Sequence, residues 1–196
     1  MNIIQCEQGT EAWFLARLGV PSASQFDKIV TIKGEPSKQA VKYLYKLAGE
    51  KVSGKPEETY QNDAMKRGVA LEDEARQLYQ IIEDVVVEQT GFCVDNGYGC
   101  SPDGLVGQDG GLEIKCPTIS THVEYLLNGT IPTAYFQQVQ GSLLVTGRKW
   151  WDFMSFYPGL KPLIVRVEPD LKFHAALKAE LLKFCEELNK TIERIK

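Results

Sequence analysis

Residues 101–117 read SPDGLVGQDGGLEIKCP, and this stretch decides which fold the chain is expected to have. A tight SPDG turn and a glycine-rich turn precede the apolar run LEIKC, a pattern typical of a hairpin that leads into a strand. Residues two positions apart on a strand face the same side, so Glu113 and Lys115 should project together while the apolar residues face the core. The hairpin would return Asp103 to a position beside Glu113. The stretch therefore predicts two carboxylates and an ammonium group gathered at a sheet edge.

These groups suit the hydrolysis of a phosphodiester with the help of a divalent metal ion. Magnesium prefers carboxylate and carbonyl oxygens, and the Ile114 carbonyl lies between the acid and the lysine. Two metal ions can activate a water and stabilise the leaving oxygen, and a lysine can orient or deprotonate that water or neutralise charge. Taken alone, the pattern also fits an exposed Glu–Lys pair after an Asp-Gly turn, because such spacings are common by chance.

Length and composition leave the function open. A chain of 196 residues with 43% hydrophobic content fits one domain over residues 1–196 with a sizeable core. No apolar run is long enough to span a membrane, and five cysteines without a CxxC pair indicate reduced thiols in a cytoplasmic protein. The net charge of −4 argues weakly against DNA as a partner, because duplex DNA is bound through its phosphates. A local basic surface or a bound metal ion would offset that charge.

The order of helical and strand-like stretches predicts an α/β or α+β domain whose central sheet is covered on both faces. Strands are expected within residues 85–117, a β-branched stretch punctuated by glycines, and two more are expected at 148–158 and 163–169. Ser22 or Ser24 is expected to cap a short helix after Pro21. The other expected helices cover residues 8–17, 38–49, 63–82, 120–127, 132–145 and 170–196.

Four blocks in order along the chain resemble one known family. They are EQGTEAW with ARLGVPSAS, then RGVALEDEARQLY, then CSPDGL followed by GLEIKCP, and finally AYFQQVQGSLLVTGRKWWDF. The sequence resembles the phage lambda exonuclease family, also called the YqaJ-type viral recombinases, within the (P)D-(D/E)xK nuclease superfamily. The resemblance covers nearly the whole chain. It implies a single nuclease domain with a restriction-endonuclease-like core, in which helices flank a central mixed β-sheet.

The resemblance implies a metal centre and a catalytic set. Asp103 and Glu113 look like metal-binding acids, with the Ile114 carbonyl as a third ligand and Glu72 as an additional acid on a helix. Lys115 looks like the catalytic lysine. Without the resemblance, Glu72 would be interpreted as a solvated helix glutamate. The cofactor implied is Mg²⁺, with two ions expected and Mn²⁺ able to substitute.

The resemblance also implies residues that bind DNA. Arg17 looks like the arginine that holds a 5′-terminal phosphate, with Ser24 and Ser101 as hydroxyl donors to phosphate. Tyr135 and Gln138 match polar contacts beside the scissile linkage, and Gln138 is counted with the catalytic residues. The alternatives are a surface arginine at 17, a helix cap at Ser24 and a half-buried core residue at Tyr135.

Met65 stands where the family places an apolar wedge between the strands at a duplex end, although an ordinary core residue fits this position equally well. The implied activity is 5′→3′ exonucleolytic digestion of double-stranded DNA with 5′-phosphorylated ends, which releases mononucleotides and leaves a 3′ overhang for strand annealing. The implied partners are two further copies in a homotrimeric ring and a phage single-strand annealing protein, in the host cytoplasm if the gene is phage-encoded. The alternatives are a (P)D-(D/E)xK endonuclease of restriction or repair type and a non-catalytic DNA-end-binding module.

Overall fold

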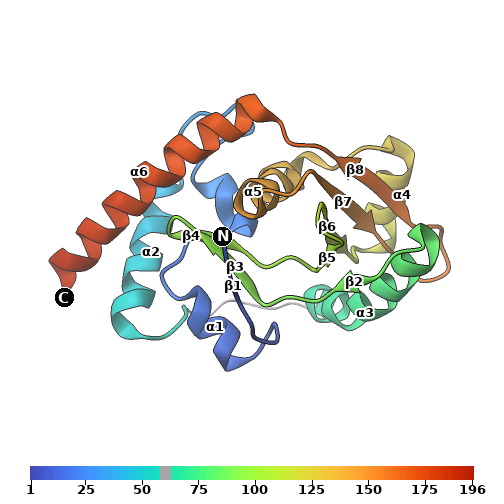
Figure 1. Ribbon diagram of the computed structural model, residues 1–196, viewed down its shortest axis with the longest axis horizontal. Helices are drawn as coiled ribbons and strands as arrows, with labels where there is room; N and C mark the ends of the chain where they lie inside the picture. The colour runs from blue at the N-terminus through green and yellow to red at the C-terminus, as the bar shows by residue number, and fades with distance from the viewer. Residues whose placement is uncertain (58–62) are drawn as a thin grey trace.

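The computed structural model of the protein describes the backbone of residues 1–57 and 63–196 (Figure 1). Side chains are described for residues 1–57 and 66–196. Helices at both ends of the chain enclose two small sheets. The helices are α1 (Glu11–Arg17), α2 (Ala40–Ser53), α3 (Asp63–Glu83), α4 (Ile119–Asn128), α5 (Phe136–Thr146) and α6 (Leu171–Ile195), with short 3-10 helices η1 (Ala23–Lys28) and η2 (Thr133–Tyr135). The strands are β1 (Asn2–Ile4), β2 (Val87–Glu88), β3 (Phe92–Asp95), β4 (Tyr98–Cys100), β5 (Gly104–Val106), β6 (Gly110–Lys115), β7 (Trp150–Ser155) and β8 (Leu163–Val167).

The larger sheet has the strand order β2-β5-β6-β7-β8. β6 and β7 are parallel and the other neighbours are antiparallel, so the sheet is mixed, as the sequence predicts. Helices cover it on both faces, which confirms the expected α+β architecture. On one face, α3 packs Ala75 and Tyr79 against Ile114 and Met154. On the other face, α5 packs its apolar residues against strand side chains, in the cluster Leu105, Val139, Leu143, Trp151 and Phe153.

A second sheet of order β1-β3-β4 lies apart from the first. The sequence predicts one sheet over residues 85–117, and the structure divides these strands between two. The division arises because β3 and β4 form their own hairpin around Asn96 and Gly97, which both have positive φ angles of 51° and 86°. β1 then pairs with β3 and completes the smaller sheet.

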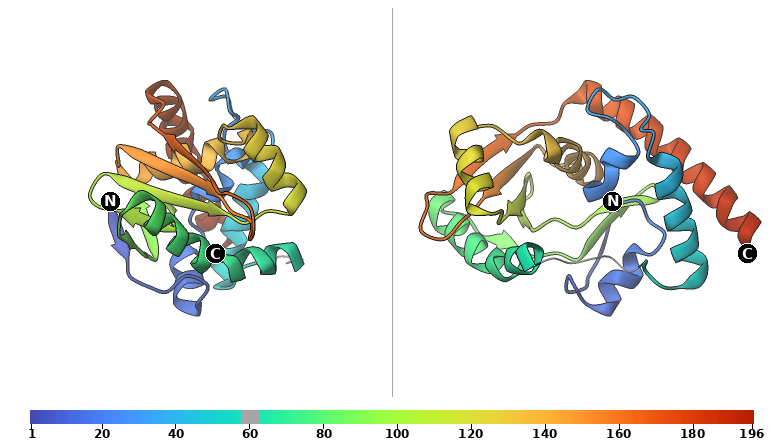
Figure 2. Two further views of the ribbon diagram at one scale, coloured as in Figure 1. Left: turned by 90° about the vertical axis from the view of Figure 1, so that its right-hand side faces the viewer. Right: turned by 180° about the vertical axis from the view of Figure 1, so that it is seen from behind.

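The smaller sheet shares a core with α2, α6 and η1. α6 begins at Asp170, whose side chain accepts a hydrogen bond from the Phe173 amide, and it buries one apolar stripe. Seen from the front and from behind, the α2–α6 pair and the larger sheet occupy opposite ends of the molecule (Figures 1 and 2). No helix among the described residues is long and apolar enough to cross a membrane.

The chain returns from β6 to β7 through α4, η2 and α5, and this crossover allows the two strands to run parallel. β6 lies so close to β7 that only glycine fits at position 111. A Cβ built there would lie 2.3 Å from the Trp151 ring. The same crossover brings Gln138, on α5, within hydrogen-bond distance of Glu113 on β6.

Candidate active site

The hairpin between β5 and β6 brings together the residues of the opening sequence stretch. Asp103 directly precedes β5, and its carboxylate Oδ2 accepts a hydrogen bond from the Ile114 amide at 2.6 Å. The Asp103 amide in turn donates to the Leu112 carbonyl at 3.2 Å. Two backbone-linked contacts thus hold Asp103 beside Glu113, as the sequence predicts.

The position of this group within the sheet differs from the prediction. A sheet edge is expected from the sequence, but β6 is the middle strand of the five-stranded sheet. The reason is that β7, which is remote in sequence, pairs in parallel along the whole of β6 and places Glu113 opposite Phe153. The acids consequently lie at the end of a central strand, where Glu113 is only 1% exposed.

Glu113 is the hub of the side-chain contacts. Its Oε1 atom pairs with Lys115 Nζ at 2.5 Å and accepts a hydrogen bond from Gln138 Nε2 at 2.6 Å. Lys115 Nζ also lies 5.2 Å from the centre of the Tyr135 ring, which stacks on Phe153 at 5.2 Å. Tyr135 is therefore a half-buried residue that packs on the core beside Lys115, and its contact with DNA stays a prediction.

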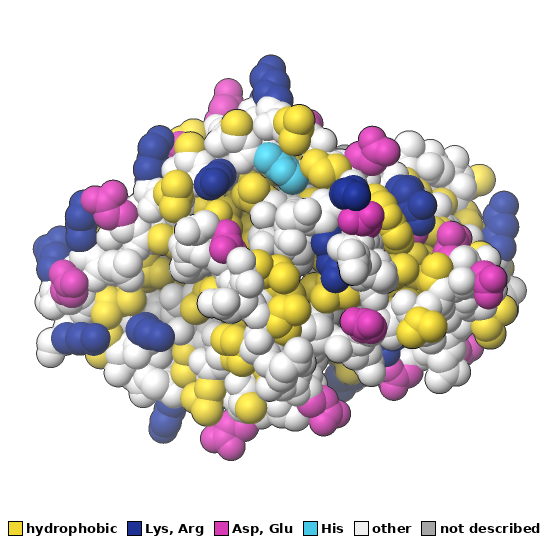
Figure 3. Space-filling model, viewed as in Figure 1, with side chains coloured by type: hydrophobic (Ala, Val, Ile, Leu, Met, Phe, Trp, Pro, Cys, Tyr) yellow, Lys and Arg dark blue, Asp and Glu magenta, His cyan; other side chains and the backbone are white. Residues whose placement is uncertain are grey.

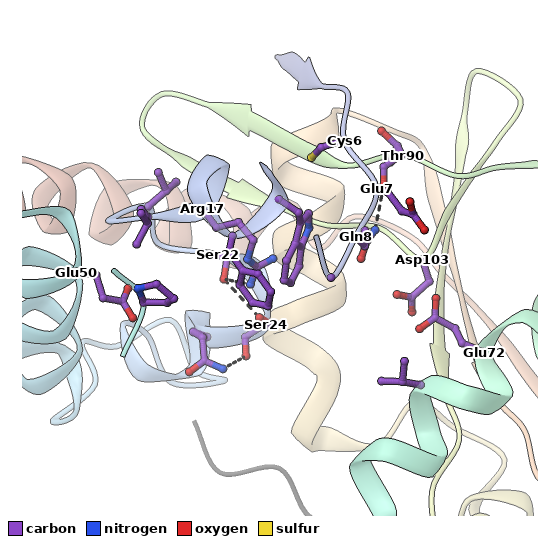
Figure 4. Close-up of a pocket in the computed structure, with 18 of the residues that line it drawn as sticks. Cys6, Glu7, Gln8, Arg17, Ser22, Ser24, Glu50, Glu72, Thr90 and Asp103 are labelled. Carbon is purple, nitrogen blue, oxygen red and sulfur yellow. Dashed lines mark hydrogen bonds between the residues drawn. The ribbon is translucent and has the colours of Figure 1, made fainter. Parts of the chain in front are cut away.

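Glu72 approaches from α3, on the helix face that also buries Ala75 and Tyr79. Figure 4 shows the Glu72 and Asp103 carboxylates pointing toward one another. Arg76 links them, since it pairs with Glu72 at 2.5 Å and donates from Nε to the Asp103 carbonyl at 3.0 Å. Sequence reasoning did not assign Arg76 to the site, although its place four residues after Glu72 on one helix face was visible. We call Glu72, Asp103, Glu113, Lys115 and Gln138 the acidic centre.

Burial is the largest influence on the pKa values of the carboxylates in the acidic centre. Burial raises the pKa of Glu113 to about 7, with Asp103 adding to the rise and Lys115 opposing it. Burial and Asp103 likewise raise the pKa of Glu72 to about 7. Burial works to lower the pKa of Lys115, but Glu113 and Asp103 outweigh it and raise the pKa of the lysine. Lys115 is therefore a cation at neutral pH.

The donor set of the acidic centre fits a hard divalent cation. Among the described residues, no three His, Cys, Asp or Glu side chains are grouped closely enough to hold a metal ion, and Glu113 pairs with Lys115 while Glu72 pairs with Arg76. Burial nevertheless raises the pKa of all three carboxylates, Glu72, Asp103 and Glu113, so that ionising them together is costly. Carboxylate and carbonyl oxygens are also the ligands that magnesium prefers, and a cation there would relieve the repulsion.

A second cluster surrounds Arg17 at the end of α1. The guanidinium lies 4.1 Å from the centre of the Trp13 ring and donates to Ser101 Oγ at 2.8 Å. It also donates to Ser22 Oγ at 3.3 Å, and Ser22 Oγ lies 3.4 Å from Ser24 Oγ. We call these five residues the arginine pocket. It unites the predicted Arg17, Ser24 and Ser101, and it adds Trp13 and Ser22, which the sequence interpretation did not assign to it.

No carboxylate among the described residues makes a direct ion pair with Arg17, although the charge of Glu50 acts on it from a distance. Burial lowers the pKa of Arg17. Its hydrogen-bond partners are neutral hydroxyls. Ser24 lies within η1 rather than at its N-cap, which is Ser22, so the interpretation of Ser24 as a helix cap is wrong. A half-buried arginine surrounded by hydroxyls is chemically suited to an anion.

One groove of 1420 Å³ extends from the arginine pocket to Glu72 and Asp103 of the acidic centre. Its lining includes Arg17, Ser22 and Ser24 at one end and Glu72, Asp103 and Arg76 at the other (Figure 4). Met65 lies in the first turn of α3, and its side chain is outside the described part of the molecule, so its wedge role stays a prediction. On the face seen in Figure 3, basic and acidic side chains are interspersed rather than gathered by sign.

A mixed sheet with Glu113 and Lys115 on its central strand, and Asp103 just before the neighbouring strand, matches the (P)D-(D/E)xK class of folds. The model of the YqaJ-like viral recombinase domain matches residues 12–149, and the chain belongs to this family. It is similar to the crystal structure of LHK-Exo in complex with dAMP, with 36% identity, a TM-score of 0.86, and coverage of 95% of this chain and 96% of the other. The structure of the alkaline exonuclease LHK-Exo from Laribacter hongkongensis matches at 35% identity with the same TM-score and coverage.

A phage-related exonuclease from Haemophilus somnus 129PT shares 15% identity, with a TM-score of 0.70 over 90% of this chain and 96% of the other, which shows the fold alone. No match was found among curated protein sequences. The comparisons therefore establish the family and the fold, and the roles of individual residues have to be argued from the geometry.

Proposed function

We propose that this protein is a Mg²⁺-dependent exonuclease that degrades one strand of duplex DNA in the 5′→3′ direction. It releases mononucleotides and leaves a 3′ single-stranded overhang for recombination by strand annealing. The observation that carries the proposal is the groove that extends from the arginine pocket to Glu72 and Asp103 of the buried acidic centre. The similarity to LHK-Exo, an alkaline exonuclease whose structure was also determined with dAMP, supports it.

The acidic centre would hold two metal ions through Glu72, Asp103, Glu113 and the Ile114 carbonyl, with Mn²⁺ able to replace Mg²⁺. Bound divalent ions supply an activated water and stabilise the leaving oxygen of a phosphodiester. Gln138 orients the Glu113 carboxylate through the 2.6 Å hydrogen bond. Lys115, which pairs with Glu113 at 2.5 Å, would orient the attacking water, accept its proton or neutralise charge on the phosphate.

The arginine pocket would bind the 5′-terminal phosphate. Arg17 can fork two hydrogen bonds to phosphate oxygens, while Trp13 fixes the plane of the guanidinium and the Ser22, Ser24 and Ser101 hydroxyls complete the donors. Anchoring the end at one side of the groove would present the first linkage to the acidic centre at the other. This arrangement gives the enzyme its direction, because only a 5′ end fills the pocket.

Two alternatives follow from the same residues. An endonuclease of restriction or repair type would use the acidic centre but has no need of a pocket for a terminal phosphate. A non-catalytic end-binding module would need the pocket but not the complete set of Glu72, Asp103, Glu113 and Lys115. The joint presence of both clusters favours the exonuclease.

The assembly and partners are proposals that rest on family membership. We propose a homotrimeric ring that encloses the DNA, with Met65 as a wedge between the strands at the duplex end. A phage single-strand annealing protein would receive the overhang, and the reaction would take place in the cytoplasm of the host cell. The acidic average charge of −4 is compatible with a ring whose few inward basic groups meet the DNA.

The test is a time course on linear duplex DNA labelled on each strand separately, with Mg²⁺ or with EDTA. The proposal predicts Mg²⁺-dependent loss of the 5′-phosphorylated strand while its complement stays intact, and no cutting of closed circular DNA. An Asp103→Asn variant is the matched inactive control. Cutting of closed circles would establish the endonuclease, and tight end binding with no cleavage in Mg²⁺ would establish the binding module.

A further inference from the structure

Behind the arginine pocket, two buried cysteines stand directly opposite one another. Cys93 on β3 and Cys100 on β4 are register partners in the small antiparallel sheet. They are 0% and 1% exposed and belong to the same core cluster, so both side chains project from the same face of the hairpin. Both are free thiols.

The local hydrogen bonding fixes the spacing of this pair. The Gly99 amide donates away from β3, to the Pro21 carbonyl at 2.9 Å, so Val94 and Gly99 form a non-hydrogen-bonded pair. Pairs alternate along an antiparallel ladder, so Cys93 and Cys100 form a hydrogen-bonded pair, whose Cα atoms are about 5.5 Å apart. Disulfides usually span about 4.4–6.8 Å between Cα atoms, so this pair is within range.

We propose that Cys93 and Cys100 are an oxidation site that forms a reversible disulfide in the presence of a peroxide. Formation of this disulfide weakens the binding of a 5′-phosphate by Arg17. The effect on Arg17 rests on the proposed function. Each cysteine is adjacent in sequence to a residue that contacts Arg17: Cys100 precedes Ser101, and Cys93 follows Phe92. Ser101 accepts from the guanidinium at 2.8 Å, and the Phe92 ring centre lies 5.6 Å from it.

The chemistry needs a peroxide as the oxidant. The Cys100 thiol donates a hydrogen bond to Cys93 and lowers the pKa of Cys93, whereas burial and that hydrogen bond raise the pKa of Cys100. Cys93 is therefore the attacking sulfur: an S–O bond forms, the peroxide O–O bond breaks and one water leaves. Cys100 then attacks the sulfenic sulfur, an S–S bond forms, the S–O bond breaks and a second water leaves. Two electrons pass from the two sulfurs to the peroxide.

Closure has a mechanical consequence. Cβ atoms of opposed residues on antiparallel strands are about 4.5–5.5 Å apart, and a disulfide requires about 3.5–4.5 Å, so β3 and β4 must be drawn together by about 1 Å. Ser101 and Phe92 move with their neighbours, and the hydroxyl leaves its place beside Arg17. Strained disulfides are more easily reduced, which makes the closed form reversible. Because the thiols are buried, the peroxide reaches them only when the short hairpin opens.

The first readout does not depend on nuclease activity. The full chain is treated with hydrogen peroxide, alkylated and digested, and its peptides are sized by mass spectrometry with and without dithiothreitol. We expect a disulfide between Cys93 and Cys100 that dithiothreitol removes. The disulfide should be absent from the Cys93→Ala and Cys100→Ala variants, and it should form in the control variant Cys185→Ala. Because opening limits access, the rate should level off as peroxide increases. Unpaired Cys93 and Cys100 in peroxide-treated, folded wild-type protein would overturn the proposal, whether or not the alanine variants fold.

The second readout is the ratio of cleavage rates on 5′-phosphorylated and 5′-hydroxyl duplex ends. Loss of one charge-assisted hydrogen bond should lower this ratio about tenfold in oxidised wild-type protein, and dithiothreitol should restore it. The ratio of Cys93→Ala should not respond to peroxide. A cross-linked protein with an unchanged ratio would overturn the coupling. If the reduced protein cleaves 5′-phosphorylated and 5′-hydroxyl ends at the same rate, the arginine pocket does not bind a terminal phosphate. The mass-spectrometric result would then still show whether the disulfide forms.

Discussion

Replacing Arg17 with glutamine should abolish most of the preference for 5′-phosphorylated ends. The guanidinium is half-buried, its hydrogen bonds go to neutral hydroxyls, and no carboxylate among the described residues pairs with it. It therefore offers a phosphate a charge-assisted fork. Each such hydrogen bond contributes about 1.5 kcal/mol at the lower end of measured values, so two contribute about 3 kcal/mol, or about 150-fold in rate.

The assay compares kcat/KM for duplexes that differ only in a 5′-phosphate or a 5′-hydroxyl. We expect the ratio to fall about 100-fold in Arg17→Gln, since the three serine hydroxyls retain part of the binding. Arg17→Lys keeps the charge but loses the fork and should give an intermediate ratio. Rates on 5′-hydroxyl ends should be the same for the wild type and both variants.

Arg194→Gln is the matched control, because Arg194 is exposed in the last turn of α6 and loses the same charge on substitution. Its ratio should equal that of the wild type. The melting temperature of Arg194→Gln should equal that of the wild type, and that of Arg17→Gln should fall modestly, because the substitution removes the contact with Trp13 and the hydrogen bonds to Ser101 and Ser22. An unchanged ratio in folded Arg17→Gln would refute the assignment of the pocket to a terminal phosphate.

Three further predictions follow from the geometry. Lys115→Ala should lower single-turnover cleavage about 10²–10⁴-fold while filter binding detects unchanged affinity for DNA, and wild-type rates would remove the lysine from the mechanism. Gly141→Ala should destabilise by about 1–3 kcal/mol in urea unfolding, because its Cβ would lie 2.4 Å from the Phe26 ring. Gly49→Ala, on α2 where a Cβ meets open space, should stabilise the protein by about 0.5–1 kcal/mol. Equal changes in unfolding free energy for Gly141→Ala and Gly49→Ala would contradict the packing described. The raised pKa of Glu113, about 7, means that its protonation favours the folded state, a contribution complete below the ordinary value of 4.5 and lost as the pH rises through 7. Melting temperatures in EDTA should therefore fall from pH 5 to pH 8 and recover with Mg²⁺ at pH 8, and a curve flat in both conditions would show that the pKa of Glu113 is not raised in the folded protein.

Local sequence patterns predicted the parts of the site that depend on short-range geometry. The pairing of Asp103 with Glu113 follows from one hairpin, whose turn and alternation are visible in residues 101–117. The contact between Gln138 and Glu113 spans a crossover, and only the family resemblance indicated that Gln138 belongs to the site. The resemblance also supplied Arg17, Ser24 and Ser101, which the structure brings into one pocket.

Long-range pairing explains what the sequence did not predict. The central position of β6 depends on β7, and nothing in LEIKC indicates a parallel neighbour on its far side. The division of residues 85–117 into two sheets depends on β1 pairing with β3. Trp13 and Ser22 reach Arg17 from elements whose relative placement no local pattern sets, although Trp13 stands in a block that carried the resemblance.

The central claim is that one groove binds a 5′-terminal phosphate and cleaves the first linkage beyond it. The most direct measurement is the size of the first product released in a single turnover from duplex DNA with a labelled 5′-phosphate. The account predicts that the label leaves in Mg²⁺ as a mononucleotide before any longer fragment forms. A labelled oligonucleotide as the first product would contradict it, because cleavage would then begin inside the duplex rather than at the end that Arg17 holds.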